Sequence, residues 1–198
     1  GLIEGIAEAT AAVAKVFSGV LSDHLRQRKG LAILGYGLAA LTKPLFPLAN
    51  SAATVFAARF LDRIGKGIRG APRDALVADL TPPAIRGAAY GLRQALDTVG
   101  AIGGPLLALV LMGWFAGNIR AVFSVAVVPA LLSVLLLVVA VHEPARAAGA
   151  APATNPLRMQ ALRRMPSAYW AVLGFASLLT LARFSEAFLI LRADSLGF

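Results

Sequence analysis

The residues best placed for chemistry are charged side chains set inside long apolar segments. One segment carries six of them at spacings of three and four residues: Arg59, Asp62, Arg63, Lys66, Arg69 and Arg73. On a helix that turns about 100° per residue, they fall within roughly 120° of one face. A stripe with this excess of cations cannot face lipid, so it must line a water-filled cavity, pair with acids elsewhere or lie partly at an interface. The surplus charge favours an anionic solute, although an internal network that stabilises one conformation is the alternative reading.

Other ionisable residues interrupt three further apolar segments. Arg93 and Asp97 stand four residues apart, so they can form a local pair or line the same cavity. Arg183 lies three residues before Glu186 and is expected at that cavity too. A buried carboxylate without a nearby cation can exchange a proton near neutral pH, which makes Glu8 and Glu186 the candidates for proton coupling. Glu8 could instead be a counter-charge to the arginine stripe.

The segments that carry these residues are long enough to cross a membrane. Only 15% of the 198 residues are charged, against about 25% in a typical soluble domain. Residues 121–141 contain no charge and just span a hydrocarbon core of about 30 Å. We predict an all-α, polytopic transmembrane helical bundle with six helices and no strands. The helices are expected at about 2–21, 30–49, 52–80, 85–115, 121–141 and 168–191.

Composition and loop charge bound the partners. The chain has no cysteine and two histidines, both expected in loops, so we predict no metal site, no cofactor and no catalytic residue. The net charge of +9 is read as basic loops facing anionic headgroups, and nucleic acid is not expected as a partner. The loops after the first, third and fifth helices hold eight Lys or Arg against two after the others. By the positive-inside rule these three loops are cytoplasmic.

A glycine-led basic motif closes the first predicted helix. Residues 19–29 resemble the loop motif Gly-x-Leu-Ala-Asp-Arg-x-Gly-Arg-Arg/Lys of the major facilitator superfamily. Gly19, Asp23, Arg28 and Lys29 fit it, whereas Arg26 stands where glycine is usual. A small Gly19 lets two helices approach, and Asp23 can pair with a neighbouring cation. The alternative is a plain basic loop that only sets topology.

Two further stretches are similar to signatures of the same family. Arg59, Gly65 and Gly67 match its fourth-helix pattern, with Arg63 in place of the first glycine. Gly100, Gly104 and Pro105 match the fifth-helix motif associated with antiporters, although its trailing glycines are absent. Ordinary small-residue helix packing would give the same pattern.

The resemblance implies that this chain is a partial transporter fold with about six of twelve helices, numbers two to seven. It divides the chain into an N-terminal bundle (1–142), a central cytoplasmic linker (143–166) and the first helix of the C-terminal bundle (167–198). It also implies that helix four borders the translocation path. The expected location is the plasma membrane, in a bacterium its inner membrane, and the full-length protein is expected to be a monomer.

The implied function is secondary active transport of a small solute by alternating access, with Asp23 and Arg28 helping to latch one state. Protons are the expected coupling ion because no nucleotide-binding loop is present. An efflux antiporter and a carrier of an anionic solute are both compatible with the motifs. One alternative is a membrane enzyme that acts on lipid headgroups and binds a divalent ion through Asp62, Asp74 and Asp79. Another is a non-transporting sensor with the same fold.

Overall fold

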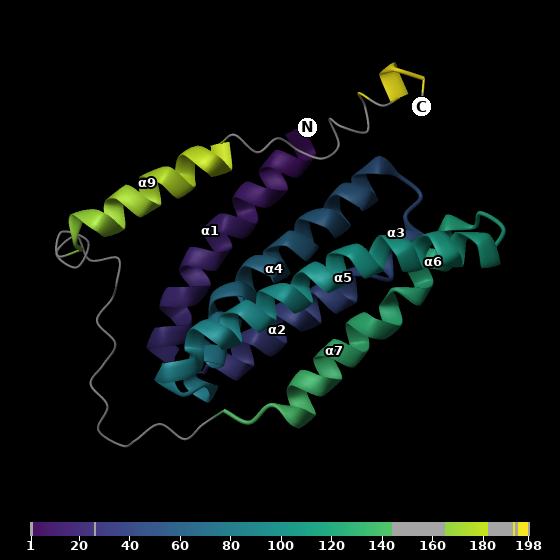
Figure 1. Cartoon of the computed structure of the whole chain (residues 1–198). Helices are drawn as coiled ribbons and strands as arrows, with labels where there is room; N and C mark the ends of the chain where they lie inside the picture. The colour runs from purple at the N-terminus through teal and green to yellow at the C-terminus, as the bar shows by residue number, and fades with distance from the viewer. Residues whose placement is uncertain (1, 26, 144–164, 182–191, 193, 198) are drawn as a thin grey trace. The chain divides into compact units, whose positions relative to one another are not determined.

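The computed structural model describes residues 2–25, 27–143, 165–181, 192 and 194–197, and its regular elements there are all helical (Figure 1). They are α1 (Leu2–Leu25), α2 (Arg28–Thr42), α3 (Leu45–Leu48), α4 (Ala52–Leu80), the 3-10 turn η1 (Pro83–Ile85), α5 (Arg86–Trp114), α6 (Ile119–Val125), α7 (Val127–Ala140) and α9 (Ser167–Leu181). The chain forms two compact units, Gly5–Ala153 and a second made of Gly1–Glu4 with Thr154–Phe198. The predicted all-α helical class is confirmed.

Four helical segments in the described residues are long and apolar enough to cross a membrane: Gly5–Leu25, Arg28–Leu48, Pro83–Trp114 and Ile119–Ala140. The helix α4 is also long, with 29 residues, but its charged stripe keeps it out of this set. A helix with so many charges is stable in a bilayer only when those charges face protein or water. The positions of its neighbours therefore decide what α4 can do.

Small residues let α1 and α2 pack on different sides of α4. On one side, Gly35 of α2 lies so close that a Cβ atom added to it would be 2.6 Å from the backbone nitrogen of Arg69. On the other side, a Cβ atom at Gly67 would be 2.6 Å from the carbonyl oxygen of Ala11 in α1. Ser18 of α1 also donates a 3.2 Å hydrogen bond to the carbonyl oxygen of Gly67. These contacts make α1, α4 and α2 the packed core of the larger unit.

We expect Gly35→Ala to destabilise the fold and Gly37→Ala, on the same helix, to be neutral or mildly stabilising. The added methyl group at position 35 would overlap backbone atoms of α4, and such overpacking costs about 1–3 kcal/mol. At position 37 no atom lies within 4 Å, so the higher helix propensity of alanine is gained without a clash. Thermal unfolding of the detergent-solubilised full-length protein measures both. Equal unfolding temperatures for the two variants would contradict the close α2–α4 contact.

Two predicted helices are split where proline removes a backbone donor. The segment expected at 30–49 divides into α2 and α3, with Pro44 at the break and Pro47 within α3. The segment expected at 121–141 divides at Ala126, next to Pro129 in the first turn of α7. The expected end of the third helix at about residue 80 is observed, because α4 ends at Leu80, just before Pro82 and Pro83. A turn separates α5 from α6, with φ of +81° at Gly117.

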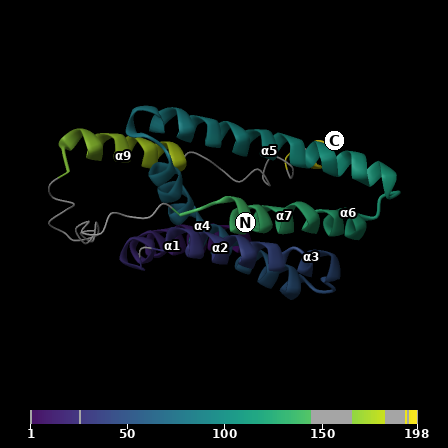
Figure 2. The same cartoon turned by 90° about the horizontal axis from the view of Figure 1, so that it is seen from below.

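The helix α5 meets the core at its first half. The Tyr90 hydroxyl donates a 2.8 Å hydrogen bond to the carbonyl oxygen of Asp74 in α4. In the view of Figure 2, α7 lies beside α2, whereas α5 stands apart from α1 and α2. No residue of α5 is buried in the described structure. The described polar contacts between α5 and α4 run from Tyr90 and Arg93 to Asp74.

The second unit contributes one described helix, α9, which has no charged residue over Ser167–Leu181. The expected sixth helix was to run to about residue 191, and residues 182–191 lie outside those described. Most of the expected linker at 143–166 lies outside them as well. The predicted domain boundaries therefore stay predictions.

Candidate functional site

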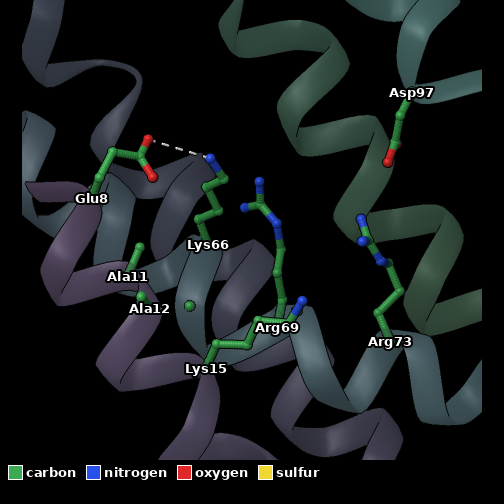
Figure 3. A pocket seen from close by; sticks show the side chains of 10 residues that line it. Glu8, Ala11, Ala12, Lys15, Lys66, Arg69, Arg73 and Asp97 are labelled. Atoms are coloured by element: carbon green, nitrogen blue, oxygen red, sulfur yellow. Dashed lines mark hydrogen bonds and ion pairs between the residues drawn. The ribbon is translucent and has the colours of Figure 1, made fainter. Parts of the chain in front are cut away.

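A cavity of about 390 Å³ lies between α1, α4 and α5, and charged side chains gather around it (Figure 3). Its lining residues are Glu8, Ala11, Ala12, Lys15, Lys66, Gly67, Arg69, Gly70, Arg73 and Asp97. Four of these side chains are cationic and two are anionic, so the lining has a net positive charge. Its volume falls in the range of about 300–1,000 Å³ that is usual for small-molecule sites.

Glu8 of α1 binds two cations of the α4 stripe. Its Oε1 atom lies 2.7 Å from Nη1 of Arg63 and 3.5 Å from Nζ of Lys66. The Arg63 side chain is 13% exposed, whereas that of Glu8 is 49% exposed toward the cavity. The structure thus places this predicted proton-coupling candidate as a counter-ion between α1 and α4.

Asp74 holds three cations from three helices. Its carboxylate lies 3.8 Å from Nζ of Lys15 in α1, 3.2 Å from Nη2 of Arg73 in α4 and 3.7 Å from Nη1 of Arg93 in α5. Arg93 also pairs with Asp97 at 2.9 Å, the spacing that the sequence indicated. The pair is therefore a local ion pair, and Asp97 is among the residues that line the cavity whereas Arg93 is not.

Arg69 is the exception among the cavity cations. Its Cζ atom lies over the ring of Tyr36 in α2, 4.6 Å from the ring centroid. Among the described residues, no carboxylate lies within 4.0 Å of its guanidinium group, and no protein acceptor takes a hydrogen bond from it. Lys15, Lys66 and Arg73 each have an acidic partner. Among the described residues, Arg69 is therefore the cavity cation whose guanidinium group has no hydrogen-bond acceptor.

The acid of the predicted stripe lies outside the cavity lining. Asp62 accepts a 2.9 Å hydrogen bond from Nζ of Lys43, and its side chain is 15% exposed. The same Lys43 nitrogen lies 5.8 Å from the ring centroid of Phe46, which stacks on Phe123 of α6. Arg59 is half-buried on α4, one turn before Asp62 and Arg63. Arg183, expected at the cavity, and Glu186, the second proton-coupling candidate, lie outside the described residues.

A second ion cluster forms at the predicted cytoplasmic end, and we call Asp23, Arg28 and Asp79 the Arg28 cluster. Arg28 of α2 pairs with Asp23 of α1 at 3.3 Å and with Asp79 of α4. It also donates a 2.9 Å hydrogen bond to the carbonyl oxygen of Ala75. The Arg28 side chain is only 13% exposed. One guanidinium group thus joins the ends of three helices.

The segment after α7 joins the same end of the bundle. The carboxylate of Glu143 accepts hydrogen bonds from the backbone nitrogens of Arg28 at 2.8 Å and Lys29 at 3.3 Å. It thereby caps the start of α2, where Gln27 provides no side-chain cap. Lys29 returns the contact by donating from Nζ to the carbonyl oxygen of Val138, at 2.8 Å. These hydrogen bonds tie the start of α2 to the end of α7.

The glycines of the predicted motifs have different surroundings. A Cβ atom at Gly19 would lie 3.3 Å from Cβ of Ala71 in α4, so this position is a close helix contact. At Gly100 and Gly104, which precede Pro105 in α5, a Cβ atom would meet no described atom within 4 Å. The packing role of this α5 motif stays a prediction.

An apolar groove lies on the other face of α4. It has a volume of about 610 Å³ and is lined by Ala14, Phe17, Ser18, Val20, Leu21, His24, Leu31, Leu34, Ile64 and Ile68. On a helix of about 100° per residue, Ile64 and Ile68 lie roughly 150° from the mean direction of Lys66, Arg69 and Arg73. The bundle therefore has one charged face and one apolar face.

The three aspartates of the enzyme alternative do not converge. Asp62 binds Lys43, Asp79 binds Arg28, and Asp74 binds its three cations. In the part of the chain that the structure describes, no group of three His, Asp or Glu side chains could hold a metal ion. This geometry offers no carboxylate site for a divalent ion there.

Several partners in these clusters had no role that could be predicted from the sequence: Lys15, Tyr36, Lys43 and Glu143. Their contacts join residues far apart in the sequence: Lys43 and Asp62 are 19 positions apart, and Arg28 and Glu143 are 115 positions apart. For Glu143, its charge next to a predicted helix end was the available signal, and it did not identify the partner.

Together, the long apolar helices, the charged α4 and the cavity define a polytopic membrane protein with a charged cavity. The family model of the Major Facilitator Superfamily matches residues 1–198. An uncharacterized MFS-type transporter of Methanocaldococcus jannaschii is 31% identical over 98% of this chain and 47% of its own length. The human vesicular acetylcholine transporter is 31% identical over 93% of this chain and 35% of its own length. An uncharacterized protein of Mycobacterium tuberculosis is 35% identical over 54% of this chain and 26% of its length. No solved structure matches.

This chain belongs to the major facilitator superfamily. It is part of an integral membrane protein, and it spans half or less of the length of the curated relatives it matches. The family resemblance inferred from the sequence motifs is confirmed.

Proposed function

We propose that the full-length protein is a secondary active transporter that carries a small anionic solute by alternating access. The observation that carries this proposal is Arg69, a cavity cation without an acidic partner among the described residues. A guanidinium group offers five N–H donors in a fork that fits a carboxylate or phosphate. The solute's anionic group would take the place of the missing partner.

The predicted domains suggest how the solute would cross the membrane. Residues 1–142 form most of one helical bundle, and 167–198 begin the second, with the linker 143–166 between them. In transporters of this kind, two bundles rock around a central site. The family membership and the cavity between α1, α4 and α5 support this arrangement. We further propose that the full-length protein works as a monomer in the plasma membrane, the inner membrane of a bacterium.

Uptake into proteoliposomes made with the full-length protein tests the function. We expect accumulation of succinate or inorganic phosphate and none of choline, a cation. Arg69→Ala should lower anion uptake by about tenfold or more, because a hydrogen bond to a charged group contributes about 1.5–3 kcal/mol. Arg120→Ala is the matched control, since Arg120 binds Asn50 and lies outside the cavity lining. Transport of choline alone, or anion uptake that Arg69→Ala leaves unchanged, would contradict the proposal.

Proton coupling is proposed through Glu8. A proton on Glu8 removes the negative charge that balances Arg63 and Lys66, so protonation should favour anion binding in the cavity. This order of events predicts uptake driven by an acidic exterior and loss of that drive in Glu8→Gln, with solute exchange retained. Antiport, which the Gly100–Pro105 motif suggests by resemblance, requires the opposite direction of the pH gradient. The direction that drives uptake therefore decides between the two.

The human relative is named for acetylcholine. Acetylcholine is a cation, and the net positive lining of this cavity would repel it. We therefore do not transfer that cargo to this chain.

A further inference from the structure

The aromatic ring of Tyr36 lies beneath the cationic head of Arg69, whose Cζ atom is 4.6 Å from the ring centroid. A guanidinium group at this distance is attracted by the electron-rich face of the ring. Tyr36 belongs to α2 and is half-buried, whereas the cavity itself is lined by α1, α4 and α5. The ring therefore supports Arg69 from behind the cavity wall.

The close approach of the α2 and α4 backbones also fixes the contact between Tyr36 and Arg69. Gly35, the residue before Tyr36, is the point of closest approach between α2 and α4. A Cβ atom on it would lie 2.6 Å from the backbone nitrogen and 2.7 Å from Cβ of Arg69. Gly65, one turn earlier on α4, makes the reciprocal contact, with a Cβ atom 2.8 Å from the carbonyl oxygen of Gly35. Ring and guanidinium group are thus held in register by a rigid helix pair.

The contact leaves the donors of Arg69 available. A ring face attracts the positive charge and accepts no conventional hydrogen bond, and the described residues offer this guanidinium no other acceptor. Figure 3 shows the Arg69 side chain extending from α4 between Lys66 and Arg73. Lys66 forms an ion pair with Glu8, and Arg73 forms one with Asp74. Of these three cations, Arg69 alone is held by a neutral group among the described residues.

We infer that Tyr36 is a positioning residue, which holds the fork of Arg69 so that it binds a planar oxyanion of the solute. The inference rests on the proposed function and deepens it. An acidic residue in place of Tyr36 would neutralise Arg69 and compete with the solute. A ring fixes the guanidinium group and leaves its charge for the solute. The cavity should consequently prefer carboxylates, which match the two parallel N–H donors, and Arg69→Lys should lose this preference.

Succinate binding to the purified full-length protein tests the inference, with choline as the control solute. We expect Tyr36→Phe, which keeps the ring, to retain affinity within about twofold of the wild type. Tyr36→Leu should weaken succinate binding by about tenfold, as expected for a desolvated cation–π contact. The maximal rate of succinate exchange should change less than its half-saturating concentration, because the solute is bound less tightly and the moving helices are intact.

A fluorinated series at position 36 guards against a simple folding defect. Phenylalanine with one, two and three ring fluorines has nearly the same shape but a progressively less negative ring face. We expect succinate affinity to fall stepwise along the series while the unfolding temperature without succinate stays constant. A merely structural ring would show no such trend.

The outcomes separate this inference from the proposed function. If succinate binds the wild type, is lost in Arg69→Ala and binds Tyr36→Leu with wild-type affinity, the role of Tyr36 is overturned and the anion site stands. A flat fluorine series has the same meaning. If the wild type responds to neither succinate nor inorganic phosphate, the proposed function fails and this inference with it.

Discussion

Replacing Arg28 with alanine is expected to abolish most transport and to lower the unfolding temperature clearly. The change removes the cation between Asp23 and Asp79 and leaves the Ala75 carbonyl oxygen without its donor. Breaking a buried ion pair costs about 3–5 kcal/mol. Because the two carboxylates are 35% and 27% exposed, we expect a smaller loss here, about 2 kcal/mol. The repelling carboxylates would then separate the ends of α1 and α4.

Arg86→Ala is the matched control for this prediction. Arg86 lies at the same end of the bundle, but its Nε atom donates to the carbonyl oxygens of Ala78 and Thr81 and pairs with no described carboxylate. We expect it to keep most of the uptake and stability. Arg28→Lys should be intermediate, since one ammonium group cannot reproduce the forked contacts. If Arg28→Ala matched Arg86→Ala in both measurements, the Arg28 cluster would have no role in the transport cycle.

Asp74→Asn should loosen α1 and α5 from α4 at the same time. The substitution keeps the shape but removes the charge that balances Lys15, Arg73 and Arg93. Three cations would then face one another across a partly dry site, with a cost of about 1–2 kcal/mol after allowing for the 30% exposure of Asp74. We expect a lower unfolding temperature and faster proteolysis or hydrogen exchange within α5.

The companion variant is Asp97→Asn. Among the described residues, Asp97 pairs with Arg93 alone, and it is 51% exposed, so its loss should affect α5 little. Hydrogen–deuterium exchange of the full-length protein compares the two variants directly. Equal exchange in α5 for both would mean that Asp74 does not hold this helix against α4.

The fold was largely predictable because transmembrane helices can be recognised from local sequence, by their apolar length and by the residues at their ends. The bounds expected for α4, 52–80, are those observed, since Ser51 caps its start and prolines follow its end. The other membrane-spanning helices were predicted from the length of their apolar segments. The breaks at Pro44 and Ala126 were missed because a proline near a helix end can either kink a helix or end it. Only the packing of neighbouring helices decides which occurs.

The site was predictable as a set of charges but not as a set of pairs. Helical spacing placed Lys66, Arg69 and Arg73 on one face, and all three line the cavity. Periodicity says nothing about which helix supplies the counter-charge, so the triple contact of Asp74 and the ring of Tyr36 could not be read from the sequence. Those contacts depend on how closely α1, α2 and α4 approach, and glycines at specific turns set that distance.

The central claim is that the charged face of α4 lines an aqueous cavity that attracts anions, and the reactivity of two engineered cysteines tests it most directly. This chain has no cysteine of its own. Ala12 of α1 lines the cavity, and Ala14, two residues later, lines the apolar groove. We predict that Ala12→Cys in the membrane-embedded protein reacts with a negatively charged thiosulfonate several-fold faster than with a positively charged one. Ala14→Cys should react slowly with both. Faster reaction of Ala12→Cys with the positive reagent, or equal reactivity at the two positions, would contradict the account.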